Sequence, residues 1–112
     1  MVSMAPTTTF AVARPSIHFF QINLQHCKAA TALMCDRLSR MQTFIALIQE
    51  PWTTQGGVRG FETLTNCDVH SPICSRQRTC IVASKDLKTT VINHLCDQDT
   101  TVVTLGRRGI RN

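Results

Sequence analysis

The sequence predicts an α/β fold (α+β, layered) with one mixed sheet and one main covering helix. Two short apolar runs rich in Ile and Phe, residues 16–22 and 44–48, have the composition of buried strands. Apolar residues between them recur at three- and four-residue steps, as in an amphipathic helix. A strand, a helix and a strand in this order favour a parallel pair of strands joined by a right-handed crossover.

The helix is expected over residues 28–41, where apolar residues form one stripe. The residues of this stripe are Ala30, Leu33, Met34, Cys35, Leu38 and Met41. Of these, Leu33, Met34 and Leu38 should be buried against the two strands. Their expected partners on the strands are Phe19, Ile22, Ile45 and Leu47.

The remainder of the chain predicts more strands and two irregular ends. Further strands are expected near 58–64 and at 79–83, 89–95 and 100–105, with the first of these lying in a glycine-containing loop over residues 51–72. Residues 1–15 lack periodicity and are expected to form a disordered tail. Residues 106–112 are expected to be a basic tail, so that 16–105 form one partial domain that stops before its sheet is complete.

Composition and net charge narrow the kinds of partner and the cellular compartments that we expect for this protein. The net charge of +5 favours a phosphate-bearing partner, although a basic solvated surface accounts for it equally well. No apolar run approaches the roughly 20 residues that cross a membrane, and no secretory signal is evident. We therefore expect no membrane partner and an intracellular location, with the nucleus as one candidate. Six cysteines without that signal favour reduced thiols over disulfides, and their spacing is too wide for a zinc knuckle.

Two polar residues close the predicted parallel strands. Asn23 follows the first apolar run, and Glu50 follows the second. Parallel strands end on the same edge of a sheet, and open α/β sheets bind ligands at that edge. The pattern therefore predicts a carboxylate and an amide side by side. Taken singly, Asn23 is equally well a turn residue and Glu50 a solvated loop carboxylate.

The residues around both strand ends resemble a known domain. Residues 20–27 read Phe-Gln-Ile-Asn-Leu-Gln-His-Cys, and residues 47–52 read Leu-Ile-Gln-Glu-Pro-Trp. In this order and spacing they resemble the start of the endonuclease domain of LINE-type (non-LTR) retrotransposons. This domain belongs to the endonuclease/exonuclease/phosphatase superfamily, which includes apurinic endonucleases and DNase I. Residues 78–83 and 97–103 are similar to the strands that follow in that family, so the resemblance covers about residues 16–105.

The resemblance implies the N-terminal portion of a four-layer sandwich and magnesium-dependent hydrolysis of DNA phosphodiesters. It assigns catalytic roles to Asn23 and Glu50, with Glu50 as a ligand of Mg²⁺. A carboxylate suits this hard cation, and the Asn23 amide can donate a hydrogen bond to phosphate. DNA is the implied partner. Candidates for contact with nucleic acid are His26, Trp52, Arg76 and Arg78, for which ordinary roles in a turn, at the sheet edge or on a solvated surface are the alternative.

The chain also departs from the family pattern. It contains no Tyr, no Asp-x-Asn and no Ser-Asp-His, and Asp68-Val69-His70 comes too early to replace the last of these. We therefore expect a fragment of an endonuclease that is inactive alone. The alternative function is a small, non-catalytic basic module that binds nucleic acid or a protein. A zinc- or thiol-based module is a third hypothesis.

Overall fold

The computed structural model describes residues 16–55, 57–72 and 76–107. The main sheet is built from β1 (His18–Asn23), β2 (Phe44–Gln49), β5 (Cys67–His70) and β6 (Thr79–Ser84). The helix α1 (Lys28–Leu38) connects β1 to β2. Two hairpins complete the described part. The small one pairs β3 (Thr53–Thr54) with β4 (Gly57–Val58). The larger one pairs β7 (Leu87–Val91) with β8 (Val103–Arg107), and the short 3₁₀ helix η1 (Asn93–Leu95) lies in the connection between these two strands.

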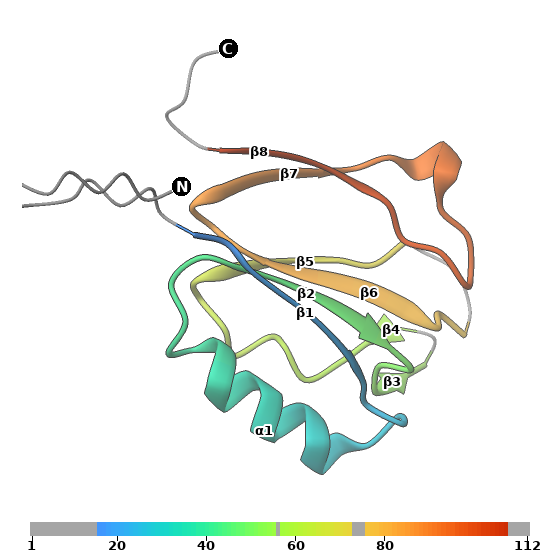
Figure 1. The fold of residues 1–112 in the computed structure, drawn as a ribbon. Coiled ribbons are helices and arrows are strands. Elements are labelled where there is room, and N and C mark those ends of the chain that lie inside the picture. Colours follow the sequence, from blue (N-terminus) through green and yellow to red (C-terminus); the bar gives the residue numbers. More distant parts are fainter. Residues whose placement is uncertain (1–15, 56, 73–75, 108–112) are drawn as a thin grey trace, which may run out of the picture.

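The main sheet has the order β1-β2-β6-β5. Strands β1 and β2 are parallel, whereas β6 is antiparallel to both β2 and β5. Figure 1 shows α1 below this sheet and the β7–β8 hairpin above it. The described part of the chain is therefore a mixed sheet with one main helix, as the sequence predicts. The predicted tail over residues 1–15 and most of the predicted basic tail lie outside the described residues.

The helix covers one face of the sheet and forms the larger core with it. Its buried residues are Thr31, Met34, Cys35 and Leu38. Of these, Met34, Cys35 and Leu38 share a cluster with the buried β2 side chains Phe44, Ala46 and Ile48 and with Cys80 and Val82 of β6. At the N-terminus of the helix, the Cys27 Sγ accepts a hydrogen bond from the Ala30 amide. The helix ends at Leu38, three residues before the predicted end.

Three of the residues predicted to be in the core are exposed, so their predicted contacts are wrong. Leu33 is 71% exposed, Phe19 is 60% exposed and Leu47 is 38% exposed. The buried stripe of α1 is rotated so that Thr31 replaces Leu33 on the sheet side. On the strands, alternate residues point to opposite faces, so Phe19 and Leu47 lie on the face away from the helix.

A smaller core lies on the opposite face of the sheet. It consists of the buried residues Ile45, Ile81, Ala83 and Leu87, with Val103 of β8 partly buried against them. The pairing of Phe19 with Ile45 across β1 and β2 puts Ile45 on this face, and not against the helix as predicted. The hairpin above is linked to the sheet by a 2.6 Å hydrogen bond between His70 Nε2 and Thr89 Oγ1.

Several predicted strand boundaries are also wrong. The predicted strand 58–64 is confined to the end of the small β3–β4 hairpin, and Phe61 beyond it is buried as part of a loop. The predicted strand 89–95 ends at Val91, because residues 93–95 form η1. Strand β5 is not among the predicted strands, because it lies in the glycine-containing stretch 51–72, which has little continuous apolar sequence.

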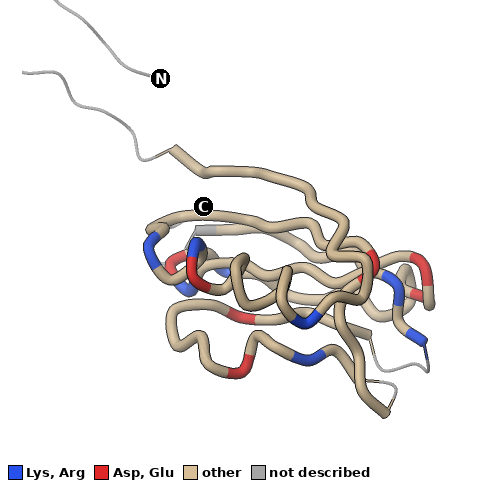
Figure 2. The backbone as a smooth tube through the Cα atoms, turned by 90° about the horizontal axis from the view of Figure 1, so that it is seen from below, with Lys and Arg blue, Asp and Glu red and all other residues tan. Residues whose placement is uncertain are grey.

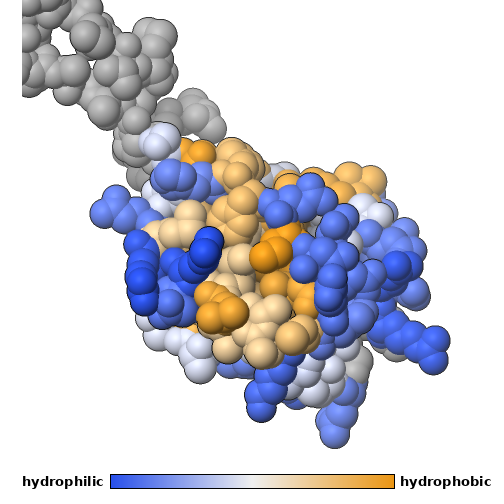
Figure 3. Space-filling model, turned by 60° about the horizontal axis from the view of Figure 1, so that its bottom comes forward, coloured by the Kyte–Doolittle hydropathy of each residue, from blue (hydrophilic) through white to orange (hydrophobic). Residues whose placement is uncertain are grey.

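The surface is mixed in charge and partly apolar. Figure 2 shows acidic and basic positions interspersed around the backbone. With the bottom of Figure 1 turned forward, Figure 3 shows an apolar area flanked by hydrophilic side chains. Among the described residues, no helix is long and apolar enough to cross a membrane.

Candidate functional site

The candidate site lies at the edge of the sheet where β1 and β2 end together. Their parallel register runs from His18 opposite Phe44 to Asn23 opposite Gln49. The pairing continues for one more step, because the Leu24 amide donates to the Gln49 carbonyl over 2.9 Å. Asn23 and Glu50 therefore lie at the ends of neighbouring strands, and both line one hollow.

A tight turn leads from β1 into the helix and brings His26 to the same edge. The Asn23 Oδ1 accepts a 2.8 Å hydrogen bond from the Gln25 amide, which is the turn role that an asparagine at a strand end commonly has. Gln25 and His26 both have positive φ, at 51° and 55°. The His26 amide then donates to the Glu50 carbonyl over 2.9 Å. The turn is therefore tied directly to the end of β2.

Glu50 has an unusual backbone conformation. Its φ is 50°, in the left-handed region that non-glycine residues seldom adopt. Two backbone hydrogen bonds hold it there, one from the Glu50 amide to the Arg78 carbonyl and one from the His26 amide to the Glu50 carbonyl. The buried Pro51 follows. Such strain persists where neighbouring structure enforces it, and it concentrates at functional sites.

Both oxygens of the Glu50 carboxylate are paired with basic side chains. Oε1 accepts hydrogen bonds from Arg78 Nη2 at 2.9 Å and Nε at 3.3 Å. Oε2 lies 2.5 Å from His26 Nε2, and His26 Nδ1 donates to the Pro51 carbonyl over 2.9 Å. The hydrogen bond from Arg78 holds the pKa of Glu50 below its usual range, and Glu50 in turn raises the pKa of Arg78. The carboxylate is therefore ionised at neutral pH.

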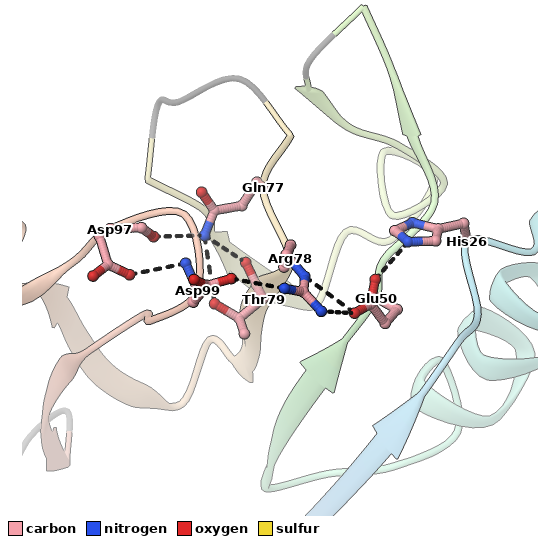
Figure 4. A network of polar contacts seen from close by, with 7 residues as sticks. All are labelled: His26, Glu50, Gln77, Arg78, Thr79, Asp97 and Asp99. Atoms are coloured by element: carbon pink, nitrogen blue, oxygen red, sulfur yellow. Dashed lines mark hydrogen bonds and ion pairs between the residues drawn. The ribbon is translucent and has the colours of Figure 1, made fainter.

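Arg78 also reaches a second carboxylate (Figure 4). Its Nη1 lies 3.3 Å from Asp99 Oδ1, so its guanidinium is placed between Glu50 and Asp99. The Asp99 turn is fixed from within, because the Asp99 amide donates to Asp97 Oδ1 over 2.8 Å. It is fixed to β6 by Arg78, whose amide donates to the Gln98 carbonyl over 2.8 Å.

The buried side chain of Gln77 anchors the same turn to the start of β6. Its Nε2 donates to the Thr79 carbonyl over 3.0 Å and to the Asp97 carbonyl over 3.2 Å. The hydroxyls of Thr79 and Thr101 lie 2.9 Å apart and add a further link. Among the described residues, no buried side-chain nitrogen or oxygen lacks a hydrogen-bond partner. The turn that carries Asp99 is therefore a fixed part of the site.

Two hollows of similar size meet at the Glu50–Arg78 pair. The first, of about 290 Å³, is lined by Asn23, Gln49, Glu50, Arg78, Thr79 and Asp99. The second, of about 280 Å³, is lined by His26, Glu50, Thr53, Arg76, Gln77, Arg78 and Gln98. Five of the six residues that the sequence singled out, Asn23, His26, Glu50, Arg76 and Arg78, thus line one or both hollows.

Trp52 lies elsewhere. Its half-buried ring lines a groove of about 440 Å³ between α1 and residues 60–64, and Lys28 Nζ is 5.4 Å from the ring centroid. A cation over the ring face is a favourable arrangement that also covers this part of the indole. The predicted contact of Trp52 with nucleic acid is therefore not part of the hollows beside Glu50.

Sequence reasoning missed Asp99, Gln77 and Thr79 as members of the site. Nothing local marks them, because Gln77 and Thr79 come to this edge through the pairing of β6 with β2, and Asp99 through the docking of the 97–101 turn on the start of β6. The described cysteines, Cys27, Cys35, Cys67, Cys80 and Cys96, are free thiols, and burial raises the pKa of Cys67 to about 11 and that of Cys80 to about 12. The remaining cysteine, Cys74, lies outside the described residues.

Comparisons with protein-family models, with curated proteins and with solved structures find no match to this chain.

Proposed function

We propose that the chain carries part of the active site of a magnesium-dependent DNA endonuclease of the type that its sequence resembles. The observation that carries this proposal is the parallel β1–β2 pair, which ends in register and leaves Asn23 and Glu50 lining one hollow. The target is a phosphodiester of DNA. The described hydrogen bond of the Asn23 side chain engages its Oδ1, so its side-chain NH₂ can donate to a phosphate oxygen.

The oxygen donors at this edge fit a magnesium ion held mainly by water and substrate. Among the described residues, no group of three or more His, Cys, Asp or Glu could hold a metal. Mg²⁺ commonly uses one or two carboxylates together with water and phosphate oxygens. Glu50 is the ligand proposed, with Asp99 as the second carboxylate of the hollow. When bound, Mg²⁺ would supply charge stabilisation at the scissile phosphate.

Cation binding that depends on Glu50 tests this proposal. In calorimetric titrations of the 112-residue chain with MgCl₂, we expect Glu50→Gln to weaken binding about tenfold, because the variant removes an anionic ligand. Glu62→Gln is the matched control, since Glu62 is an exposed carboxylate paired with Arg59 elsewhere on the fold. Equal Mg²⁺ binding by the wild type and Glu50→Gln would overturn the assignment.

Hydrolysis by this chain alone is not expected. The sequence lacks the Tyr, the Asp-x-Asn and the Ser-Asp-His that the resemblance implies for the rest of the active site, so the general base that the resemblance implies is missing. Incubation with supercoiled plasmid and Mg²⁺ should leave the plasmid intact. Nicking by the wild type that disappears in Glu50→Ala would show that these residues suffice for catalysis.

The alternative, a non-catalytic basic module, differs in one measurable respect. Its binding of a duplex oligonucleotide would follow net charge: it would weaken as Mg²⁺ competes for the phosphates, and it would tighten slightly and equally in Glu50→Gln and Glu62→Gln, which each remove one negative charge.

A further inference from the structure

Arg78 pairs with carboxylates from two other segments at the candidate site. Its guanidinium pairs with Glu50 at the end of β2 and with Asp99 in the turn that follows η1. It also forms part of the wall of both hollows. Figure 4 shows the guanidinium between the two carboxylates, with His26 on the far side of Glu50.

This arrangement places a fixed positive charge where a divalent cation would approach. A cation in the first hollow gains the attraction of Glu50 and Asp99, but it meets the repulsion of Arg78 at short range. An approaching phosphodiester is attracted by Arg78 but repelled by Glu50 and Asp99. These two carboxylates also occupy the hydrogen-bond donors of the guanidinium. Each ligand alone is therefore opposed by the ion pairs that the site already contains.

We propose that Arg78 makes Mg²⁺ and the phosphodiester bind cooperatively, by exchanging its carboxylate partners for phosphate oxygens when the cation takes the carboxylates. The identity of both ligands rests on the proposed function. The guanidinium fork matches phosphate as well as carboxylate, so the exchange preserves paired hydrogen bonds. Arg78 binds the substrate phosphate directly in this scheme.

The structure allows this exchange without a change of fold. The Arg78 side chain is 53% exposed, so its movement uncovers no core. Its backbone is held on both sides, by the Glu50 amide at the carbonyl and by the Gln98 carbonyl at the amide. Only the side chain therefore needs to turn, from the carboxylates toward a ligand in either of the hollows that it lines.

Coupling of this kind is reciprocal and can be measured as binding alone. For the wild type, we expect a saturating duplex oligonucleotide to tighten Mg²⁺ binding by about fivefold or more. Arg78→Gln should tighten Mg²⁺ binding in the absence of DNA by about threefold to tenfold, because it removes the repulsive charge. In the same variant, the oligonucleotide should no longer alter Mg²⁺ affinity.

Three controls distinguish the effect of the Arg78 charge, the effect of its side-chain shape and the effect of the phosphate charge of the DNA. Arg40→Gln loses the same charge and an exposed ion pair with Asp36 on α1, and it should leave both measurements unchanged. Arg78→Lys keeps the charge without the fork, so its Mg²⁺ affinity without DNA should stay near that of the wild type while the coupling falls. A methylphosphonate oligonucleotide of the same sequence, which lacks the phosphate charge, should give no coupling in any variant. Circular dichroism of each variant verifies that the fold is retained.

Two results would overturn the proposal. One is Mg²⁺ binding that depends on Glu50 but is unchanged or weakened in Arg78→Gln. The other is equal coupling in the wild type and Arg78→Gln. By contrast, Mg²⁺ binding that is indifferent to Glu50→Gln would reject the proposed function itself, so the two failures are distinguishable.

Discussion

Glu50 combines backbone strain and charge at a single position. Glu50 lies between strand β2 and the buried Pro51 and has a left-handed φ of 50°. Its carboxylate pairs with both His26 and Arg78. Residues in this region of conformational space persist only where other contacts enforce them, and here the backbone bonds to His26 and Arg78 do so. The same two residues therefore fix both the backbone and the side chain of Glu50.

At the residue scale, Gln77 is expected to stabilise the turn that carries Asp99. Gln77→Leu removes the donor to the Thr79 and Asp97 carbonyls, and should lower the free energy of unfolding by about 1–3 kcal/mol. Urea denaturation measures this change. Gln98→Leu is the control, because its side chain is exposed, and its effect should stay within about 0.5 kcal/mol. Equal effects of the two substitutions would contradict the anchoring role of Gln77.

Local sequence predicts some of these residues and not others. Asn23 and Glu50 could be found because Asn23 directly follows one apolar run and Glu50 lies one residue beyond the end of the other, so the strand ends themselves mark them. Asp99 could not be found in this way. Its place beside Arg78 depends on hydrogen bonds between segments about twenty positions apart, and no local pattern encodes that contact.

At the element scale, α1 and the loop over residues 59–64 are packed closely at Gly60. Its φ is 103°, and an added Cβ would lie 2.4 Å from the Thr31 side chain and 3.2 Å from the Trp52 ring. The Cys35 Sγ donates to the Gly60 carbonyl over 3.0 Å, which ties the loop to the helix. Glycine is required here because both the backbone conformation and the available space exclude a side chain.

Gly60→Ala should therefore destabilise the fold by about 1–3 kcal/mol in urea denaturation. Gly57→Ala is the matched control, since the nearest atom to its added Cβ, the Thr54 carbonyl oxygen, is 3.8 Å away. We expect a clearly smaller change for the control. A Gly60→Ala protein as stable as the wild type would show that the loop is not held against α1.

The helix also shows why element type is easier to predict than orientation. Its spacing of apolar residues predicts a helix, and a helix is present. The same spacing is satisfied by two stripes that overlap, one with Leu33 and one with Thr31. In the folded chain the stripe with Thr31 is the buried one, and the Thr31 hydroxyl donates to the Cys27 carbonyl over 2.8 Å.

At the scale of the whole molecule, the connectivity of the first three elements determines where the site lies. A parallel pair joined by a helix was predictable from the order of the apolar segments, and it brings two strand ends to one edge. The other half of the site consists of Arg78 and Asp99. Arg78 directly precedes β6, and Asp99 lies in the turn that packs against the start of β6. Antiparallel pairing of β6 with β2 places the start of β6 beside the end of β2, which is why Arg78 meets Glu50.

The central claim is that this edge of the sheet is a cation site built around Glu50. Mn²⁺ prefers oxygen ligands, as Mg²⁺ does, and broadens nearby amide signals in a ¹H–¹⁵N NMR spectrum. At substoichiometric Mn²⁺ we predict selective broadening at Asn23, Glu50, Thr79 and Asp99, and its loss in Glu50→Gln. Broadening centred on other carboxylates such as Asp36 or Asp68, or broadening at the edge that persists in Glu50→Gln, would contradict the claim.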